Sequence, residues 1–141
     1  MLYKDFLKNL DKCPFCDGGN NRHLLKTETA YLTYALAPYH KHHLLIVPFR
    51  HEEIILGLTD KEVLDMDFLQ EEALKIFKKL GYKNMSVLER EGDNTSKSIP
   101  HLHNHVIPEV RIGDLDHNGN ERRVMSESEI KDVVDEIFSV L

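Results

Sequence analysis

The sequence predicts a single α+β domain, in which a largely antiparallel sheet packs against one long helix and a second helix ends the chain. β-like runs stand both before and after one long helical segment. The links between these runs are too short for the repeated crossovers that parallel strands require. The 141 residues, 41% apolar and 30% charged, suffice for one hydrophobic core. We therefore expect one domain over 1–141.

The N-terminal half is predicted to contain three strands. Two β-like runs cover about 23–29 and 31–37, and the second ends at Pro38. A third run, 43–47, is mostly apolar and is closed by Pro48, which is typical of a buried strand.

A long helix is predicted to follow. Thr59 and Glu62 have the spacing of a capping box, which marks a helix N-terminus, and Gly81 is placed to end the helix. Apolar residues recur every three or four positions between them and predict one buried stripe: Val63, Met66, Leu69, Ala73, Ile76 and Leu80.

The second half is predicted to add two strands, 85–89 and 99–110, and a C-terminal helix over about 127–140. A second capping box, Ser126 with Glu129, marks the start of that helix. Asn118-Gly119 between them suggests a hairpin tip.

The net charge and the lack of long apolar segments argue against nucleic acid and membranes as binding partners. The formal net charge of −6 predicts no broad basic surface for duplex nucleic acid, although a small anionic ligand remains compatible with it. The longest apolar run, 44–47, is too short to cross a bilayer, and the first residues lack a signal-peptide pattern. We therefore expect a cytoplasmic protein with no membrane partner.

Three of the nine histidines alternate within five residues, as His101-Leu102-His103-Asn104-His105. In an extended strand, alternate side chains share one face, so the three imidazoles are predicted to point the same way. Such a row can bind a metal or supply a nucleophile with helpers, because neutral imidazole is abundant near pH 7. The alternative is a polar surface stripe.

The only cysteines are three apart, as Cys13-Pro14-Phe15-Cys16. In a cytosolic chain such a pair is more often metal-binding or redox-active than a disulfide. The redox alternative lacks the helix that should begin at the motif and lower the thiol pKa. The spacing of Asp114, Asp116 and Asn118 resembles the start of an EF-hand calcium-binding loop. Met125 occupies the twelfth position, which requires Glu, so the sequence does not favour a calcium site.

The sequence resembles the histidine triad (HIT) family, whose signature is His-x-His-x-His followed by two apolar residues, here 101–107. The similarity covers roughly 13–110. The segment 38–51 resembles the family's apolar strand that ends in a proline and a histidine. Gly92 and Ser98 stand nine and three residues before the first triad histidine, as in the family.

The resemblance implies an active site. His103 would attack the α-phosphorus of a nucleotide-like substrate and form a covalent nucleotidyl-histidine that water resolves. His105 would hydrogen-bond a phosphate or leaving-group atom, and Ser98 would hold phosphoryl oxygens. His43 would support the triad at the substrate pocket, where Arg90 and Lys97 could complement phosphate.

The resemblance also implies a homodimer with a structural zinc site. Some branches bind zinc through an N-terminal Cys-x-x-Cys, a histidine after the apolar strand and the first triad histidine. The matching residues here are Cys13, Cys16, His51 and His101, a Cys₂His₂ set without an open position.

Several residues of this sequence differ from those usual in the family, and these differences bear on which substrate the pocket accepts. The family usually places Asp or Asn, which grips the ribose hydroxyls, where this chain has Ala35. Arg90 and Lys97 replace a frequent Asn and Gln, and Asn104 replaces an apolar residue, so a polar partner is expected behind the triad strand.

The expected activity is hydrolysis of a nucleotidyl phosphoramidate, a dinucleoside polyphosphate or a related phosphate ester. One alternative is a nucleotidyltransferase with a phosphate acceptor, although uridylyltransferase relatives carry Gln at the position of His105. The other is a zinc-stabilised nucleotide-binding module without turnover.

Overall fold

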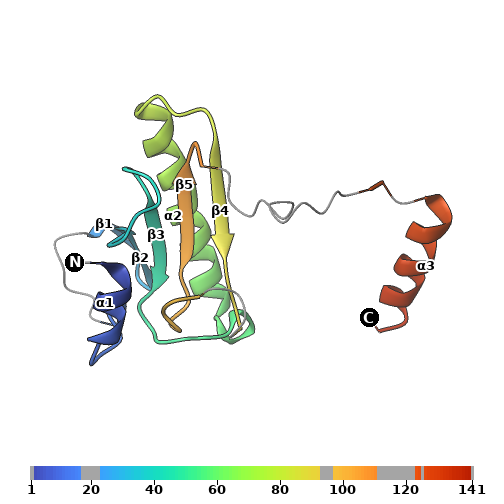
Figure 1. The fold of residues 1–141 in the computed structure, drawn as a ribbon, viewed down its shortest axis with the longest axis horizontal. Helices are drawn as coiled ribbons and strands as arrows, with labels where there is room; N and C mark the ends of the chain where they lie inside the picture. The colour runs from blue at the N-terminus through green and yellow to red at the C-terminus, as the bar shows by residue number, and fades with distance from the viewer. Residues whose placement is uncertain (1, 17–22, 93–96, 111–122, 125, 141) are drawn as a thin grey trace.

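A five-stranded antiparallel sheet forms the centre of the computed structural model, which describes residues 2–16, 23–92, 97–110, 123–124 and 126–140. The strands are β1 (His23–Lys26), β2 (Ala30–Tyr34), β3 (Leu44–Pro48), β4 (Met85–Glu89) and β5 (Asn104–Pro108). Their order is β1-β2-β3-β5-β4, so β5 lies between β3 and the edge strand β4 (Figure 1). The predicted α+β class and antiparallel sheet are confirmed.

One face of the sheet is covered by α2 (Asp60–Lys79), the predicted long helix. The capping box is present: the Glu62 amide donates to Thr59 Oγ1 at 3.1 Å, and the Thr59 amide donates to Glu62 Oε1 at 2.9 Å. Gly81 follows with a φ of +90°, a left-handed conformation that costs glycine little. The core on this face consists of Ala30, Leu32, Leu44, Ile46, Met66, Leu69, Ala73, Phe77 and Val106.

The predicted stripe on α2 is wrong at its two ends. Val63 and Leu80 are about half exposed, whereas Phe77 is fully buried. Near the start of α2 the side chains of Glu62 and Asp65 are buried instead. They bind Arg50 and Thr29, so ion pairing and hydrogen bonding, rather than apolar contact, orient this end of the helix.

The opposite face is covered by the N-terminal segment, which begins with the short helix α1 (Tyr3–Lys8). Phe15 packs there in a second core cluster with Tyr31, Ala35, Leu45, Val47 and Ile99. The six residues of α1 are too few to show a helical period, so the sequence did not predict this helix.

The predicted strand 99–110 is too long, because β5 covers only Asn104–Pro108. Residues before it turn away from the sheet, and the Leu102 amide donates to the Glu52 carbonyl at 2.8 Å instead of to a neighbouring strand. Glu109 ends the strand with a φ of 60°. His101 and His103 therefore precede β5, and their positions do not follow from strand alternation.

The C-terminal helix is confirmed as α3 (Glu127–Phe138), capped by Ser126 and Glu129. None of its residues is buried. The suggested hairpin tip at Asn118-Gly119 and the calcium-like loop lie outside the described residues. Within the described ranges, none of the helices combines the length and apolarity needed to span a membrane.

Candidate functional site

A cavity of about 550 Å³ opens on the face of the sheet opposite α2. Four parts of the chain line it: α1, the Cys-x-x-Cys turn, the chain from the end of β2 to β3, and residues between the end of β4 and β5, namely Arg90 and four residues within 98–105. Its lining residues are Tyr3, Lys4, Phe6, Leu7, Pro14, Phe15, Ala35, Leu36, Ala37, Pro38, Tyr39, His43, Leu45, Arg90, Ser98, Ile99, His103 and His105.

His103 is held in one tautomer by the backbone. Its Nδ1 lies 2.8 Å from the carbonyl oxygen of His101. A carbonyl can only accept, so Nδ1 carries the proton and Nε2 carries the lone pair. Phe15 packs against the ring with centroids 4.9 Å apart. Burial lowers the pKa of His103 to about 4, the hydrogen bond to the His101 carbonyl opposes this shift, and nearby Lys97, His101 and Arg90 add to it. At pH 7 the imidazole is neutral and nucleophilic.

His105 is oriented by a relay that starts at the backbone of Tyr39. The Tyr39 amide donates to His43 Nδ1 at 3.1 Å, so in neutral His43 the proton is on Nε2. That proton is donated to His105 Nδ1 at 2.9 Å, which leaves the His105 proton on Nε2. Burial is the main cause that lowers the pKa of His43 to about 4 and of His105 to about 3. His105 is thus a neutral N–H donor beside His103.

The other predicted substrate residues divide into two groups. Ser98 and Arg90 line the cavity with His103 and His105. Lys97 is not among the lining residues, and its Nζ donates to the Glu53 carbonyl at 3.5 Å. Ala35 does line the cavity and is buried, so the departure from the family's acidic or amide residue lies within the site.

Cys13, Cys16, His51 and His101 converge beside this cavity. One ligand atom from each lies within 4.8 Å of the others. His101 Nε2 donates to the Pro48 carbonyl at 2.7 Å, so its Nδ1 lone pair faces the sulfurs. Nδ1 is 3.4 Å from Cys13 Sγ and 3.5 Å from Cys16 Sγ, while His51 Nδ1 is 3.1 Å from Cys16 Sγ.

These separations fit a tetrahedral metal. Bonds of about 2.3 Å to sulfur and 2.0 Å to nitrogen would place the two ligands roughly 3.6 Å apart. Burial and the adjacent Cys13 raise the pKa of the Cys16 thiol to about 11, so a cation between the sulfurs would offset the cost of two neighbouring thiolates. The four residues can therefore hold a metal ion, as the sequence predicted.

One feature of the site escaped sequence reasoning, and a second was expected without its residue being identified. The first is the wall formed by α1, in which Tyr3 OH lies 2.8 Å from Ser98 Oγ. The second lies behind β5, where Glu89 is the register partner of Asn104. The expected polar neighbour of Asn104 is present, yet Glu89 Oε1 and Asn104 Oδ1 have no hydrogen-bond partner among the described residues.

The chain is similar in sequence to known proteins. A profile of the HIT domain family matches residues 20–112. The bis(5'-adenosyl)-triphosphatase of Saccharomyces cerevisiae is 31% identical over 94 residues, which cover 64% of this chain and 45% of that protein. The adenosine 5'-monophosphoramidase of Schizosaccharomyces pombe is 29% identical over 85 residues, which cover 60% of this chain and 62% of that protein. This chain thus matches about half the length of these curated relatives.

Solved structures share the fold. The histidine triad nucleotide-binding protein from Candida albicans superposes with a TM-score of 0.75 at 17% identity, covering 91% of this chain and 96% of that one. A HIT family protein from Bacillus subtilis superposes with a TM-score of 0.71 at 20% identity, covering 93% and 98%. At these identities the superpositions establish the architecture alone.

Proposed function

The chain belongs to the HIT domain family, and from that premise we propose that it hydrolyses a nucleotidyl phosphoramidate, a dinucleoside polyphosphate or a related phosphate ester. Two relatives are named for such reactions, a triphosphatase of a dinucleotide and a phosphoramidase of adenosine monophosphate. The observation that carries the proposal is the tautomer of His103. Its Nδ1 proton is committed to the His101 carbonyl, which leaves Nε2 as the nucleophile in the 550 Å³ cavity.

The proposed reaction has two displacements at phosphorus. In the first, the Nε2 lone pair of His103 forms an N–P bond as the bond from phosphorus to the leaving group breaks, and the leaving group takes the electron pair. In the second, the oxygen of water attacks phosphorus, the N–P bond breaks, and the lone pair returns to His103. The covalent nucleotidyl-histidine lies between the two steps.

His105 is proposed to stabilise the leaving group. Its Nε2–H, specified by the hydrogen bond from His43 to Nδ1, donates a hydrogen bond to the leaving-group atom in the first step, and that atom takes its proton from solvent. In the second step the attacking water loses its proton to solvent, and the His105 N–H remains a hydrogen-bond donor throughout. Arg90 and Ser98 line the cavity and would stabilise negative charge on the phosphoryl oxygens.

The metal bound by the four-residue Cys/His cluster is proposed to be zinc. Two thiolates and two imidazoles without an open position form the donor set of structural zinc. Bound there, zinc would supply a rigid cross-link rather than an activated water. His101 belongs to both sites, because its side chain is a ligand and its carbonyl orients His103.

A substrate panel with matched variants tests the proposal. Adenosine and guanosine phosphoramidates, dinucleoside tri- and tetraphosphates, nucleotide sugars and a non-nucleoside polyphosphate are offered to wild type, His103→Ala and His42→Gln. His42 lies outside the cavity lining and controls for loss of a histidine. We expect turnover of at least one compound by wild type and His42→Gln, and none by His103→Ala. Equal turnover by His103→Ala would exclude the nucleophile.

The same experiment separates the alternatives. A nucleotidyltransferase would release one burst of leaving group without an acceptor. Its continued turnover would then require an added phosphate acceptor. Binding of a compound that wild type never turns over would favour the zinc-stabilised binding module.

We also propose a homodimer, as the resemblance implied. β4 is an edge strand, and exposed apolar side chains stand on β4, on α2 and on the chain just before α2. They include Leu56 with 97% exposure, Leu64, Phe68 and Val87. A second copy that pairs with this edge would cover them. Sedimentation velocity should give twice the 16.4 kDa chain mass, and Phe68→Glu should shift it to the monomer while Leu2→Glu does not. A monomeric wild type would refute this assembly. The cytoplasmic location stays a prediction.

A further inference from the structure

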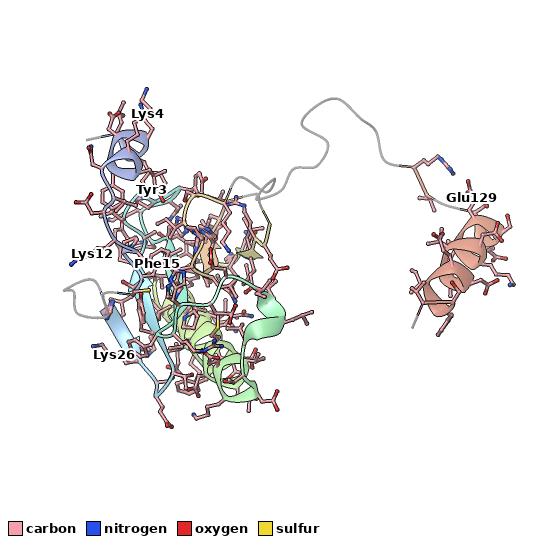
Figure 2. The ribbon with its side chains drawn as sticks, turned by 90° about the horizontal axis from the view of Figure 1, so that it is seen from below. Tyr3, Lys4, Lys12, Phe15, Lys26 and Glu129 are labelled. Atoms are coloured by element: carbon pink, nitrogen blue, oxygen red, sulfur yellow. The ribbon has the colours of Figure 1, made fainter. Side chains whose placement is uncertain are left out.

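The N-terminal helix reaches into the cavity that contains the nucleophile. Tyr3, Phe6 and Leu7 of α1 line the same cavity as His103 and His105. In Figure 2 Tyr3 lies on the side of α1 that faces the body of the domain. The Tyr3 ring stacks on Phe6, with centroids 6.0 Å apart and planes inclined by 17°. The stack holds the phenol at the cavity wall.

The Tyr3 hydroxyl meets one side chain there, Ser98. The two oxygens are 2.8 Å apart, a normal length for an O–H···O hydrogen bond. A phenol is more acidic than an aliphatic alcohol, so the Tyr3 O–H is the better donor and Ser98 Oγ the better acceptor. When Ser98 accepts from Tyr3, its own proton is free for a third group.

We propose that Tyr3 is a positioning residue, which orients the Ser98 hydroxyl so that its proton points at a phosphoryl oxygen of the bound substrate. Ser98 is exposed, so its hydroxyl would otherwise rotate and bond to water. A donor that is oriented before the reaction stabilises developing charge without reorganisation, and that advantage is realised in the transition state. The inference rests on the proposed function, since it assigns a role within the same reaction.

The tether of α1 supports this role. Four residues, 9–12, separate α1 from Cys13, which belongs to the Cys/His cluster. Phe15, two residues further on, packs in the second core and against His103. The segment that carries Tyr3 is therefore anchored at the site, and α1 lies along the β1–β3 side of the sheet (Figure 1).

A double-mutant cycle tests the proposal on whichever compound wild type turns over and His103→Ala does not. Tyr3→Phe removes the hydroxyl but keeps the ring and its stack on Phe6. We expect it to lower kcat about tenfold with KM unchanged within about twofold, as for the loss of one hydrogen bond to the transition state. In the Ser98→Ala background the same substitution should change kcat less than twofold, because there is no hydroxyl left to orient.

Lys8→Gln is the control on the same helix, since Lys8 is exposed and does not line the cavity. Unchanged kcat in Tyr3→Phe would overturn the proposal. An equal loss in both backgrounds would also overturn it and assign Tyr3 to packing of α1.

Binding of AMP to the four proteins of the cycle (wild type, Tyr3→Phe, Ser98→Ala and the double variant) gives a readout that needs no turnover. AMP has no leaving group, and its phosphoryl group carries two negative charges near pH 7, closer to the charge of the transition state than the α-phosphoryl group of a substrate, so coupling would appear as a non-additive loss of AMP affinity. If wild type turns over nothing, the proposed function fails while this measurement still decides the Tyr3–Ser98 coupling. If turnover depends on His103 but the coupling is absent in both assays, only this inference fails.

Discussion

Removal of the metal should destabilise the fold and slow catalysis together. The Cys/His cluster joins three segments of the chain: the turn at Cys13 and Cys16, the segment after β3 at His51, and the segment before β5 at His101. Through the metal, Cys16 would be linked to His101, 85 positions away. A cross-link that closes a loop of this length lowers the entropy of the unfolded chain by roughly 4.5 kcal/mol at 25 °C. For a chain of this size the loss corresponds to about 15 °C in Tm.

The assay compares metal-loaded wild type, the same protein after chelation, and Cys16→Ser. Bound metal is counted by atomic emission, and Tm is measured by calorimetry. We expect about one zinc per wild-type chain, none after chelation or in Cys16→Ser, and the Tm loss in both. Lys12→Ser, an exposed neighbour outside the cluster, should keep both the metal and the Tm.

Catalysis should follow the metal through His101. Its carbonyl fixes the tautomer of His103, so a loosened His101 would release the nucleophile from its orientation. We expect kcat/KM to fall by about 10- to 100-fold, the usual effect of losing a group that orients a functional residue. A chelated protein with unchanged Tm and unchanged kcat/KM would refute the reasoning, because the cluster would then hold neither the fold nor the nucleophile.

Three further results are expected. Because burial lowers the pKa of His103 to about 4, kcat/KM should stay level as pH falls from 7 to about 5 and lose half its value near pH 4; a midpoint near the ordinary 6.5 would contradict this. Burial raises the pKa of Glu89 above its ordinary 4.5, so the charge of this carboxylate lowers stability above that pH. Glu89→Gln should therefore raise the unfolding free energy at pH 7 by on the order of 1 kcal/mol, seen as a higher calorimetric Tm. Below pH 4.5, where Glu89 is protonated, the variant should lose this advantage. Phe77 is fully buried against the sheet, so Phe77→Ala should cost about 3–5 kcal/mol in urea unfolding, whereas the half-exposed Leu80→Ala should cost far less; equal costs would mean that the predicted stripe was right.

Local signals in the sequence determined the elements and the candidate chemistry. Capping boxes mark both helix starts because a hydroxyl and a carboxylate three residues apart satisfy backbone amides within one turn. The alternating histidines and the paired cysteines identified the candidate site residues. These features depend only on residues close together in the sequence, so they can be recognised without knowledge of the tertiary structure.

Tertiary structure decided which atoms face each other. The strand predicted over 99–110 begins only at Asn104, because Leu102 pairs with Glu52 instead of a strand. Strand alternation therefore could not place His101 and His103, which depend on carbonyl partners at Pro48 and His101. The proton positions on the imidazoles follow from those partners.

The sequence by itself thus determined the α+β class and the histidine motif, since each rests on local spacing or on residue type, whereas the set of four Cys/His residues came from the resemblance to the family. Only the tertiary structure placed Tyr3 against Ser98, 95 positions away, and Glu89 behind β5 opposite Asn104. The physical reason is that periodicity reports which face of an element is apolar, whereas contacts between distant segments depend on sheet order and register. Those are settled by the packing of the whole chain.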